Sequence, residues 1–186
     1  IDAIKALYLS GNKEQADGLK KSLQAITVSA TFKEHRKTEN LDTYSGFICL
    51  DIDDLDPREL ARIKAATMEL PYTVMAFISP SGLGLKVITM VNSESGDHKN
   101  AYMQVQNYYE KELDCVCDKT NDVARLCYIS HDSDAYVNND AEVFPITTES
   151  EQQTEQRQLV DSTSNTNEEY TDVFNRAVTY TSRKQT

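Results

Sequence analysis

Hydrophobic and polar residues alternate with two distinct periods along residues 1–146. Apolar residues that recur every three to four positions predict helices, and alternation or short apolar runs predict strands. Asp56-Pro57 marks one helix start, because Asp caps helices well and Pro suits the first turn. Helices are expected over residues 3–9, 13–23, 56–70 and from 97 to about 113, and strands over 25–32, 47–53, 72–78, 85–91, 125–129 and 142–146.

The elements between residues 47 and 129 follow the order β-α-β-β-α-β. This order is typical of the split βαβ, or ferredoxin-like, unit, whose strands lie in the spatial order 4-1-3-2. We therefore predict an α+β fold. In it, the end of the first strand lies beside the starts of the third and fourth, so Asp51 and Asp53 are expected near Lys86 and Arg125, with the turn at 79–84 opening at the same end.

The apolar strand at 47–53 ends in acidic residues. Because side chains alternate along a strand, Asp51 and Asp53 are expected on one face. Two carboxylates suit Mg²⁺ or Mn²⁺, and Mg²⁺ usually takes one or two carboxylates together with water and substrate phosphates. The alternative is a strand that ends in solvated acidic loop residues.

The turn at 79–84 joins two predicted strands and contains residues that suit phosphate. The Gly82 and Gly84 backbone lets N–H groups approach an anion, Ser79 and Ser81 carry hydroxyl donors, and Lys86 follows with a positive charge. An ordinary glycine-containing hairpin is the alternative interpretation.

The loop at 118–125 brings further charge to the same edge. Asp118 or Asp122 could complete a metal site, and Arg125 could bind a phosphate through two hydrogen bonds. A purely structural interpretation competes with this one, in which Lys86 and Arg125 form ion pairs with Asp51 and Asp53.

Net charge limits the partners of the 186-residue chain. A formal charge of −11 argues against general adhesion to nucleic acid. The first 40 or so residues are nevertheless locally basic, and Lys33, Arg36 and Lys37 are candidates for contact with a template strand, although a solvated charged face is the alternative.

The cellular compartment is inferred from the cysteines and the hydropathy. The four cysteines lack zinc-site spacing and are expected to be reduced thiols in a cytoplasmic protein. No apolar run reaches the roughly 20 residues that a membrane helix needs, so no membrane contact is expected.

Several of these motifs, in this order, resemble the VirE N-terminal-domain family of bacterial, often Bacteroides-type, mobile-element proteins. That family is similar to the archaeo-eukaryotic primase-polymerase superfamily. The resemblance covers about residues 1–147 and rests on Leu19-Lys20, Tyr44-Ser45-Gly46, Leu50-Asp51-Ile52-Asp53, Ser79-Pro80-Ser81-Gly82-x-Gly84-x-Lys86, His98, Ala124-Arg125-Leu126-Cys127 and Ser130-His131-Asp132.

The resemblance implies an RRM-like catalytic unit over 44–147, joined to an N-terminal αβ unit over 1–43, with nucleotides bound between them. It implies that Asp51, Asp53 and Asp118 hold Mg²⁺ or Mn²⁺ as catalytic residues. Ser79, Ser81, Gly82, Gly84, Lys86 and Arg125 would hold the nucleotide. Lys86 stands where the superfamily usually has a histidine, and lysine binds phosphate but does not relay a proton near neutral pH.

Two functions follow as expectations. One is nucleotidyl transfer on a single-stranded template in mobile-element replication, by a primase- or polymerase-type enzyme. The other is a catalytically inactive nucleotide- or DNA-binding module that recruits other proteins. Residues 148–186 are rich in Ser, Thr, Gln and Glu, which predicts a polar linker and the start of a C-terminal helix, and the resemblance implies that a helicase-like module follows.

Overall fold

The computed structural model describes residues 1–147, of which Ile1–Ile146 form one compact unit. The predicted linker and C-terminal helix lie outside the described residues. Within them the fold is a mixed α+β arrangement with antiparallel sheets. The α-helices are α1 (Asp2–Leu9), α2 (Lys13–Lys20), α3 (Pro57–Met68) and α4 (His98–Leu113), and the strands are β1 (Ala25–Thr27), β2 (Ala30–Phe32), β3 (Leu41–Tyr44), β4 (Phe47–Ile52), β5 (Thr73–Ile78), β6 (Leu85–Met90), β7 (Leu126–Tyr128) and β8 (Tyr136–Val137).

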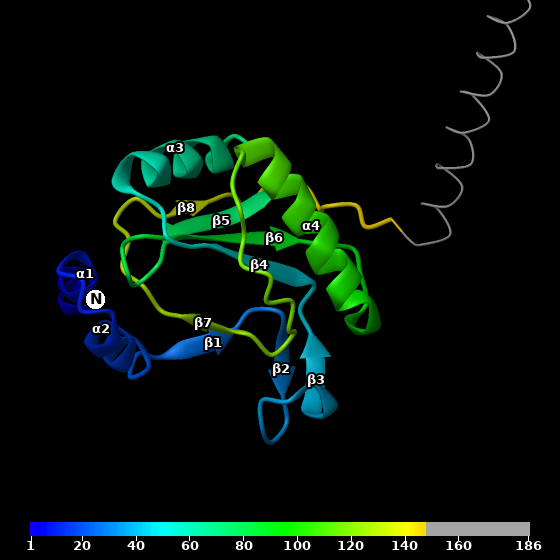
Figure 1. The fold of residues 1–186 in the computed structure, drawn as a ribbon. Helices are drawn as coiled ribbons and strands as arrows, with labels where there is room; N and C mark the ends of the chain where they lie inside the picture. Colours follow the sequence, from blue (N-terminus) through cyan, green and yellow to red (C-terminus); the bar gives the residue numbers. More distant parts are fainter. Residues whose placement is uncertain (148–186) are drawn as a thin grey trace, which may run out of the picture. The chain divides into compact units, whose positions relative to one another are not determined.

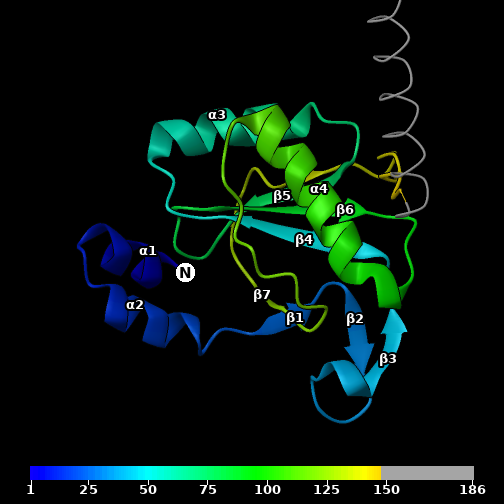
Figure 2. The same cartoon turned by 45° about the vertical axis from the view of Figure 1, so that its right-hand side comes forward.

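The largest sheet has four strands in the order β4-β6-β5-β8. Helices α3 and α4 cover one face of this sheet, and the β1–β7 pair lies below the other face (Figures 1 and 2). The spatial order of the first three predicted strands is therefore confirmed, with β6 between β4 and β5. Short 3-10 turns at Thr38–Asn40 and Ser95–Asp97 precede β3 and α4.

The fourth predicted strand differs from the expectation. β7 pairs antiparallel with β1, Cys127 opposite Ile26, and does not join the sheet beside β4. The sheet gains β8 at the opposite edge instead, through pairing with β5. Beside β4, one backbone hydrogen bond from the Asp118 N–H to the Asp51 carbonyl, 2.8 Å long, takes the place of a full strand.

Two other strand predictions were also wrong in detail. The segment 25–32 forms two strands, because the chain turns at Val28 and Ser29 and β2 then pairs with β3. The segment 142–146 forms no named strand and contributes only a single bridge between Phe144 and Val91. The four helices predicted within residues 1–147 are present, with ends that differ by a few residues.

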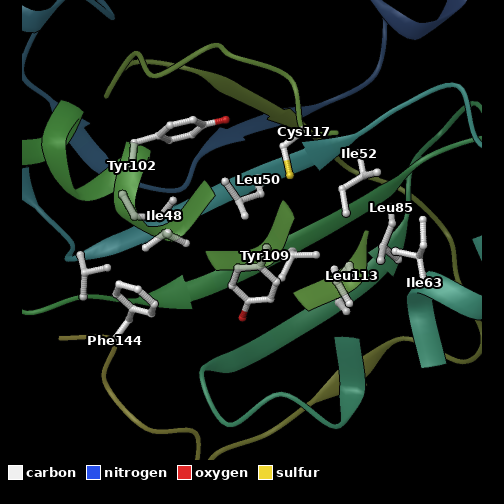
Figure 3. Packing of buried hydrophobic residues seen from close by; sticks show 14 of the residues in the cluster. Ile48, Leu50, Ile52, Ile63, Leu85, Tyr102, Tyr109, Leu113, Cys117 and Phe144 are labelled. Atoms are coloured by element: carbon white, nitrogen blue, oxygen red, sulfur yellow. The ribbon is translucent and has the colours of Figure 1, made fainter. Parts of the chain in front are cut away.

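The core lies between the sheet and the two covering helices, as Figure 3 shows. Alternation along β4 directs Ile48, Leu50 and Ile52 into this core, where each is fully buried. The buried Tyr109 hydroxyl is hydrogen-bonded to Thr73 and Thr89 at 2.9 Å each, so burial leaves it satisfied. As predicted, the Asp56 carboxylate caps α3 by accepting from the backbone N–H groups of Arg58 and Glu59.

The core-facing alternation has a consequence for the other face of β4. Because Ile48, Leu50 and Ile52 point into the core, alternation directs Asp51 and Cys49 to the opposite face of the sheet. The β1–β7 pair lies on that side of the sheet (Figure 1). The site described below is built on that face.

Candidate functional site

The site centres on Asp51, which is buried near the end of β4. Lys86 is directly opposite Asp51 in the antiparallel pairing of β4 with β6, and its ammonium forms an ion pair with Asp51 Oδ2. The side chain of Lys86 is only 3% exposed. Burial alone would lower the pKa of Lys86, but the Asp51 charge, the neighbouring Cys49 and the hydrogen bond to Asp51 together raise it, so Lys86 stays protonated.

Arg125 reaches the same carboxylate from the loop before β7. Its Nη2 lies 3.2 Å from Asp51 Oδ2 and 2.6 Å from Asp118 Oδ2, so Arg125 bridges the two acids. Burial alone would raise the pKa of Asp118, but Arg125 and the Thr120 hydroxyl lower it. Asp122 instead accepts from the Ala124 N–H at 2.9 Å and closes its own turn. Of the two candidates for a third carboxylate, Asp118 is the one that shares a cation with Asp51.

Lys86 and Arg125 therefore pair with Asp51, as the structural interpretation of the sequence expected, but they do not pair with Asp53. Both cations contact Oδ2 of Asp51. The other oxygen, Oδ1, is buried and has no hydrogen-bond partner among the described residues. A buried carboxylate oxygen without a partner is costly, so a cation bonded to this oxygen would stabilise the site.

Asp53 follows β4 and is exposed, but its carboxylate lies against the hairpin turn. A Cβ atom built on Gly84 would come within 2.8 Å of Asp53 Oδ1, so only glycine leaves room for this carboxylate. Partial burial and the nearby Asp51 charge raise the pKa of Asp53. Two neighbouring carboxylates repel each other when both are ionised, and a cation between them would relieve this repulsion.

The turn at 79–84 uses most of its polar groups internally. The Ser79 and Ser81 hydroxyls are buried and hydrogen-bonded to each other at 2.9 Å. The Gly82 N–H donates to the Ser79 carbonyl, and the Leu83 N–H donates to Ser81 Oγ. A phosphate-binding role for these four groups would need some of these hydrogen bonds to be exchanged.

Two lysines that sequence reasoning did not place at the site come from the N-terminal helices. The Lys5 side chain of α1 packs over Gly82, because a Cβ there would lie 3.1 Å from Lys5 Cγ. The Lys20 charge of α2 acts on Asp53, and the Lys20 ammonium lies 6.0 Å from the centre of the Tyr128 ring. Only the docking of α1 and α2 reveals these positions. Their signals in the sequence were the local basic composition and, for Lys20, the Leu19-Lys20 motif of the family resemblance.

The residues predicted to contact a template strand lie around the β2–β3 hairpin. Lys33 pairs with Asp42 at 3.3 Å, and Lys37 lies 4.0 Å from Glu39. The Arg36 guanidinium donates to the Ala124 carbonyl, next to Arg125. Only Arg36 of the three therefore touches the loop that carries a site residue.

The donor set can be compared with what a divalent cation needs. In the part of the chain that is described, no three His, Cys, Asp or Glu side chains are gathered as metal ligands. Asp51 Oδ1 and the Asp53 carboxylate nevertheless fit the one or two carboxylates that Mg²⁺ prefers, because neither has a cationic partner at hydrogen-bond distance. Asp118 binds Arg125 through Oδ2, and its Oδ1 accepts a hydrogen bond from the Thr120 hydroxyl at 3.1 Å.

A pair of thiols lies next to the site. Cys49 on β4 and Cys127 on β7 share a hydrogen bond, and this contact together with the Lys86 charge lowers the pKa of Cys127 to about 7. None of the four cysteines forms a disulfide. The thiol pair connects β4 to the β1–β7 layer on the same face of the sheet as Asp51.

Comparisons with known proteins identify the family. Searches of the curated proteins and of the solved structures gave no significant match. Among residues 1–147, no helix has both the length and the apolar character needed to cross a membrane. One family model, described as BT4734-like, N-terminal domain, matches residues 18–137 and therefore includes β1, the site residues of β4 and β6, and β7. The chain belongs to the BT4734-like N-terminal domain family, to which the VirE N-terminal-like proteins also belong.

Proposed function

We propose that this domain binds a nucleotide together with Mg²⁺ or Mn²⁺ at the β4 edge site, which comprises Asp51, Asp53, Lys86, Asp118 and Arg125. One observation carries the proposal: the buried Asp51 directs both cations to Oδ2 and leaves Oδ1 unpaired beside Asp53. A self-contained structural ion pair would satisfy both oxygens.

Charge balance supports the same conclusion. Asp51, Asp53 and Asp118 lie at this edge together with two cations, Lys86 and Arg125, so one negative charge is unbalanced before Lys5 and Lys20 are considered. A divalent cation bound to Asp51 and Asp53 would change the net charge of these groups from negative to positive. Lys86 and Arg125 would then turn from the carboxylates to phosphate oxygens, which Arg binds in bidentate fashion and Lys binds as a point charge.

The roles of the residues in nucleotidyl transfer follow from this arrangement. A bound Mg²⁺ or Mn²⁺ supplies Lewis-acid activation of a primer hydroxyl and stabilises the pyrophosphate leaving group. Asp51 and Asp53 would hold it, and Lys86 and Arg125 would position and neutralise the triphosphate. Lys5, over Gly82, adds a positive charge beside the turn. By its family resemblance, the template would be single-stranded nucleic acid in mobile-element replication, with a helicase-like module as a possible C-terminal partner.

A second function is a binding or recruitment module without catalysis. The observation that favours it is Lys86, which stays protonated because Asp51 raises its pKa. Lys86 therefore cannot accept or relay a proton near neutral pH, unlike the histidine that the resembling superfamily usually has at this position. The two functions share nucleotide binding and differ only in turnover.

The test is a thermal shift assay on the full chain with Mn²⁺ alone, dATP alone and both together. Because the metal must first reverse the charge of the site, dATP is expected to raise the melting temperature only when Mn²⁺ is present. Asp53→Asn should abolish this rise. Asp54→Asn is the matched control, since Asp54 is the next residue and its side chain is 89% exposed.

Two results would refute the proposal. One is an equal response of Asp53→Asn and the unaltered protein, and the other is no response to any of the three additions. Primer extension on a single-stranded DNA template then separates the two functions. Incorporation that Asp53→Asn removes indicates the enzyme, and metal-dependent binding without incorporation indicates the recruitment module.

A further inference from the structure

A pocket of about 320 Å³ lies between the helix-free face of the main sheet and the β1–β7 layer. Its volume is at the lower end of the range for small-molecule sites. We call it the base pocket and define it by six of its lining residues. Met75 and Phe77 come from β5, Ile88 from β6, Ile26 from β1, Tyr128 from β7, and Ser130 from the segment after β7.

The base pocket lies on the same face of the sheet as the β4 edge site. Asp51 is opposite Lys86 in the pairing of β4 with β6, and Lys86 is opposite Phe77 in the pairing of β6 with β5. These three residues therefore form one cross-strand row on the same face. Neighbouring strands are roughly 4.8 Å apart, so Phe77 lies about 10 Å from Asp51 and next to Lys86.

The lining of the base pocket favours a flat ring that carries hydrogen-bonding groups. Its walls are mostly apolar and include the aromatic residues Phe77 and Tyr128. Asp132, the acid at its margin, is already paired with Lys64 at 2.7 Å. The Ser130 hydroxyl oxygen is buried and has no hydrogen-bond partner in the described part of the chain. A heterocycle could bond to this hydroxyl after rotation of the Ser130 side chain toward the pocket, whereas a fatty acyl chain would leave it unsatisfied.

We propose that the base pocket binds the nucleobase of the nucleotide whose phosphates lie at Lys86 and Arg125. This inference rests on the proposed function and adds the part of the ligand that the β4 edge site does not explain. The ring would pack against Phe77, Met75 and Ile88, and Ser130 would bond to its polar edge. Stacking on an aromatic side chain binds any base, so little discrimination among bases is expected.

The first experiment compares dATP with inorganic tripolyphosphate by calorimetry on the full chain with Mn²⁺. Both carry the phosphates, and only dATP carries a base and a sugar. We expect dATP to bind about tenfold more tightly, which is the effect of one stacked base. Phe77→Leu should reduce dATP affinity to that of tripolyphosphate and leave tripolyphosphate affinity unchanged. Phe32→Leu, at a half-buried phenylalanine of β2 outside the pocket lining, is the control.

The second experiment needs no variant. In methyl NMR spectra of the unaltered protein with Mg²⁺, dATP should shift the signals of Met75 and Ile88, and the core residue Ile63 should not move. Tripolyphosphate should leave the methyl signals of Met75 and Ile88 unshifted.

The outcomes separate the two proposals. Equal affinity for both ligands, or dATP binding without a shift at Met75 and Ile88, overturns the base pocket and leaves the β4 edge site intact. Absence of binding by tripolyphosphate as well as by dATP overturns both. Shifts at Met75 and Ile88 with decanoate but not with dATP would assign the pocket to an apolar ligand and refute the inference.

Discussion

Lys86 and Asp51 face each other from directly opposed positions of β6 and β4, and both are buried. The pair therefore has a structural effect as well as the functional one proposed above. Removing one member of a buried ion pair leaves the other charge without compensation, at a cost of about 3–5 kcal/mol.

We expect Lys86→Met to lower the free energy of unfolding by an amount in this range, measured by urea denaturation at pH 7. Lys33→Met is the control, because Lys33 pairs with Asp42 in an exposed ion pair, which contributes about 0–1 kcal/mol. The double variant Asp51→Asn, Lys86→Met should lose less than the sum of the two single variants. Equal stability of Lys86→Met and Lys33→Met would show that Arg125 alone compensates Asp51.

Gly84 is expected to tolerate no side chain. A Cβ atom at this position would lie 2.8 Å from both the Ile52 carbonyl and Asp53 Oδ1, and 3.0 Å from Ser79 Oγ. Gly84→Ala should therefore cost about 1–3 kcal/mol of stability, as overpacking does, and should also weaken the metal response through Asp53. Gly96→Ala is the control, because a Cβ atom at Gly96 would have no neighbouring atom within 4 Å. Its free energy of unfolding in the same urea assay should stay within about 0.5 kcal/mol of that of the unaltered protein.

The lowered pKa of Asp132 predicts that the protein loses stability in acid. Burial alone would raise its pKa, but the Lys64 ammonium and the backbone N–H groups of Ile78 and Asp134 lower it. Because the folded-state pKa is below the unfolded one, the contribution of Asp132 is complete above the ordinary Asp pKa of about 3.9 and is lost as the pH falls through the lowered value.

Asp132→Asn should accordingly destabilise the protein at pH 7 and make its stability less dependent on pH between about 5 and 3. Urea unfolding at several pH values measures both effects. Asp140→Asn is the control, because the Asp140 side chain has no ion pair or side-chain hydrogen bond in the described region. An unchanged pH profile for Asp132→Asn would contradict the prediction.

Cys127 should react with alkylating agents as a thiolate near neutral pH. The Cys49 hydrogen bond, together with the Lys86 charge, outweighs burial and lowers the pKa of Cys127 to about 7. The rate of iodoacetamide labelling, followed for the Cys127 peptide by mass spectrometry, should therefore rise with a midpoint near pH 7. Cys49→Ala should move this midpoint upward, and Cys115→Ala should leave it in place. The same midpoint in Cys49→Ala would show that the thiol contact has no effect.

The parts of the fold that local patterns determine were predictable from the sequence. The order β4-β6-β5 follows from a helix crossover and a hairpin, both of which connect elements close in sequence. The proximity of Lys86 to Asp51 followed from this order. Asp51 was also predictable as the first acid after an apolar alternation.

The pairing of β7 could not be predicted in the same way. Its partner β1 comes about 100 residues earlier, and three-residue strands carry too little pattern to specify a distant partner. The two-residue β8 gives no periodic signal at all. The positions of Lys5 and Lys20 depend on how α1 and α2 dock, which no local pattern encodes.

The pairing of β7 with β1 also determines how short a functional fragment can be. Arg125 immediately precedes β7, and within residues 1–147 the only strand that pairs with β7 is β1, at residues 25–27. A fragment that begins at residue 44 would keep Asp51, Asp53 and Lys86 but would leave β7 without a partner strand. The N-terminal segment is thus a required component of the site, and deletion studies of this family should begin their shortest fragments upstream of β1.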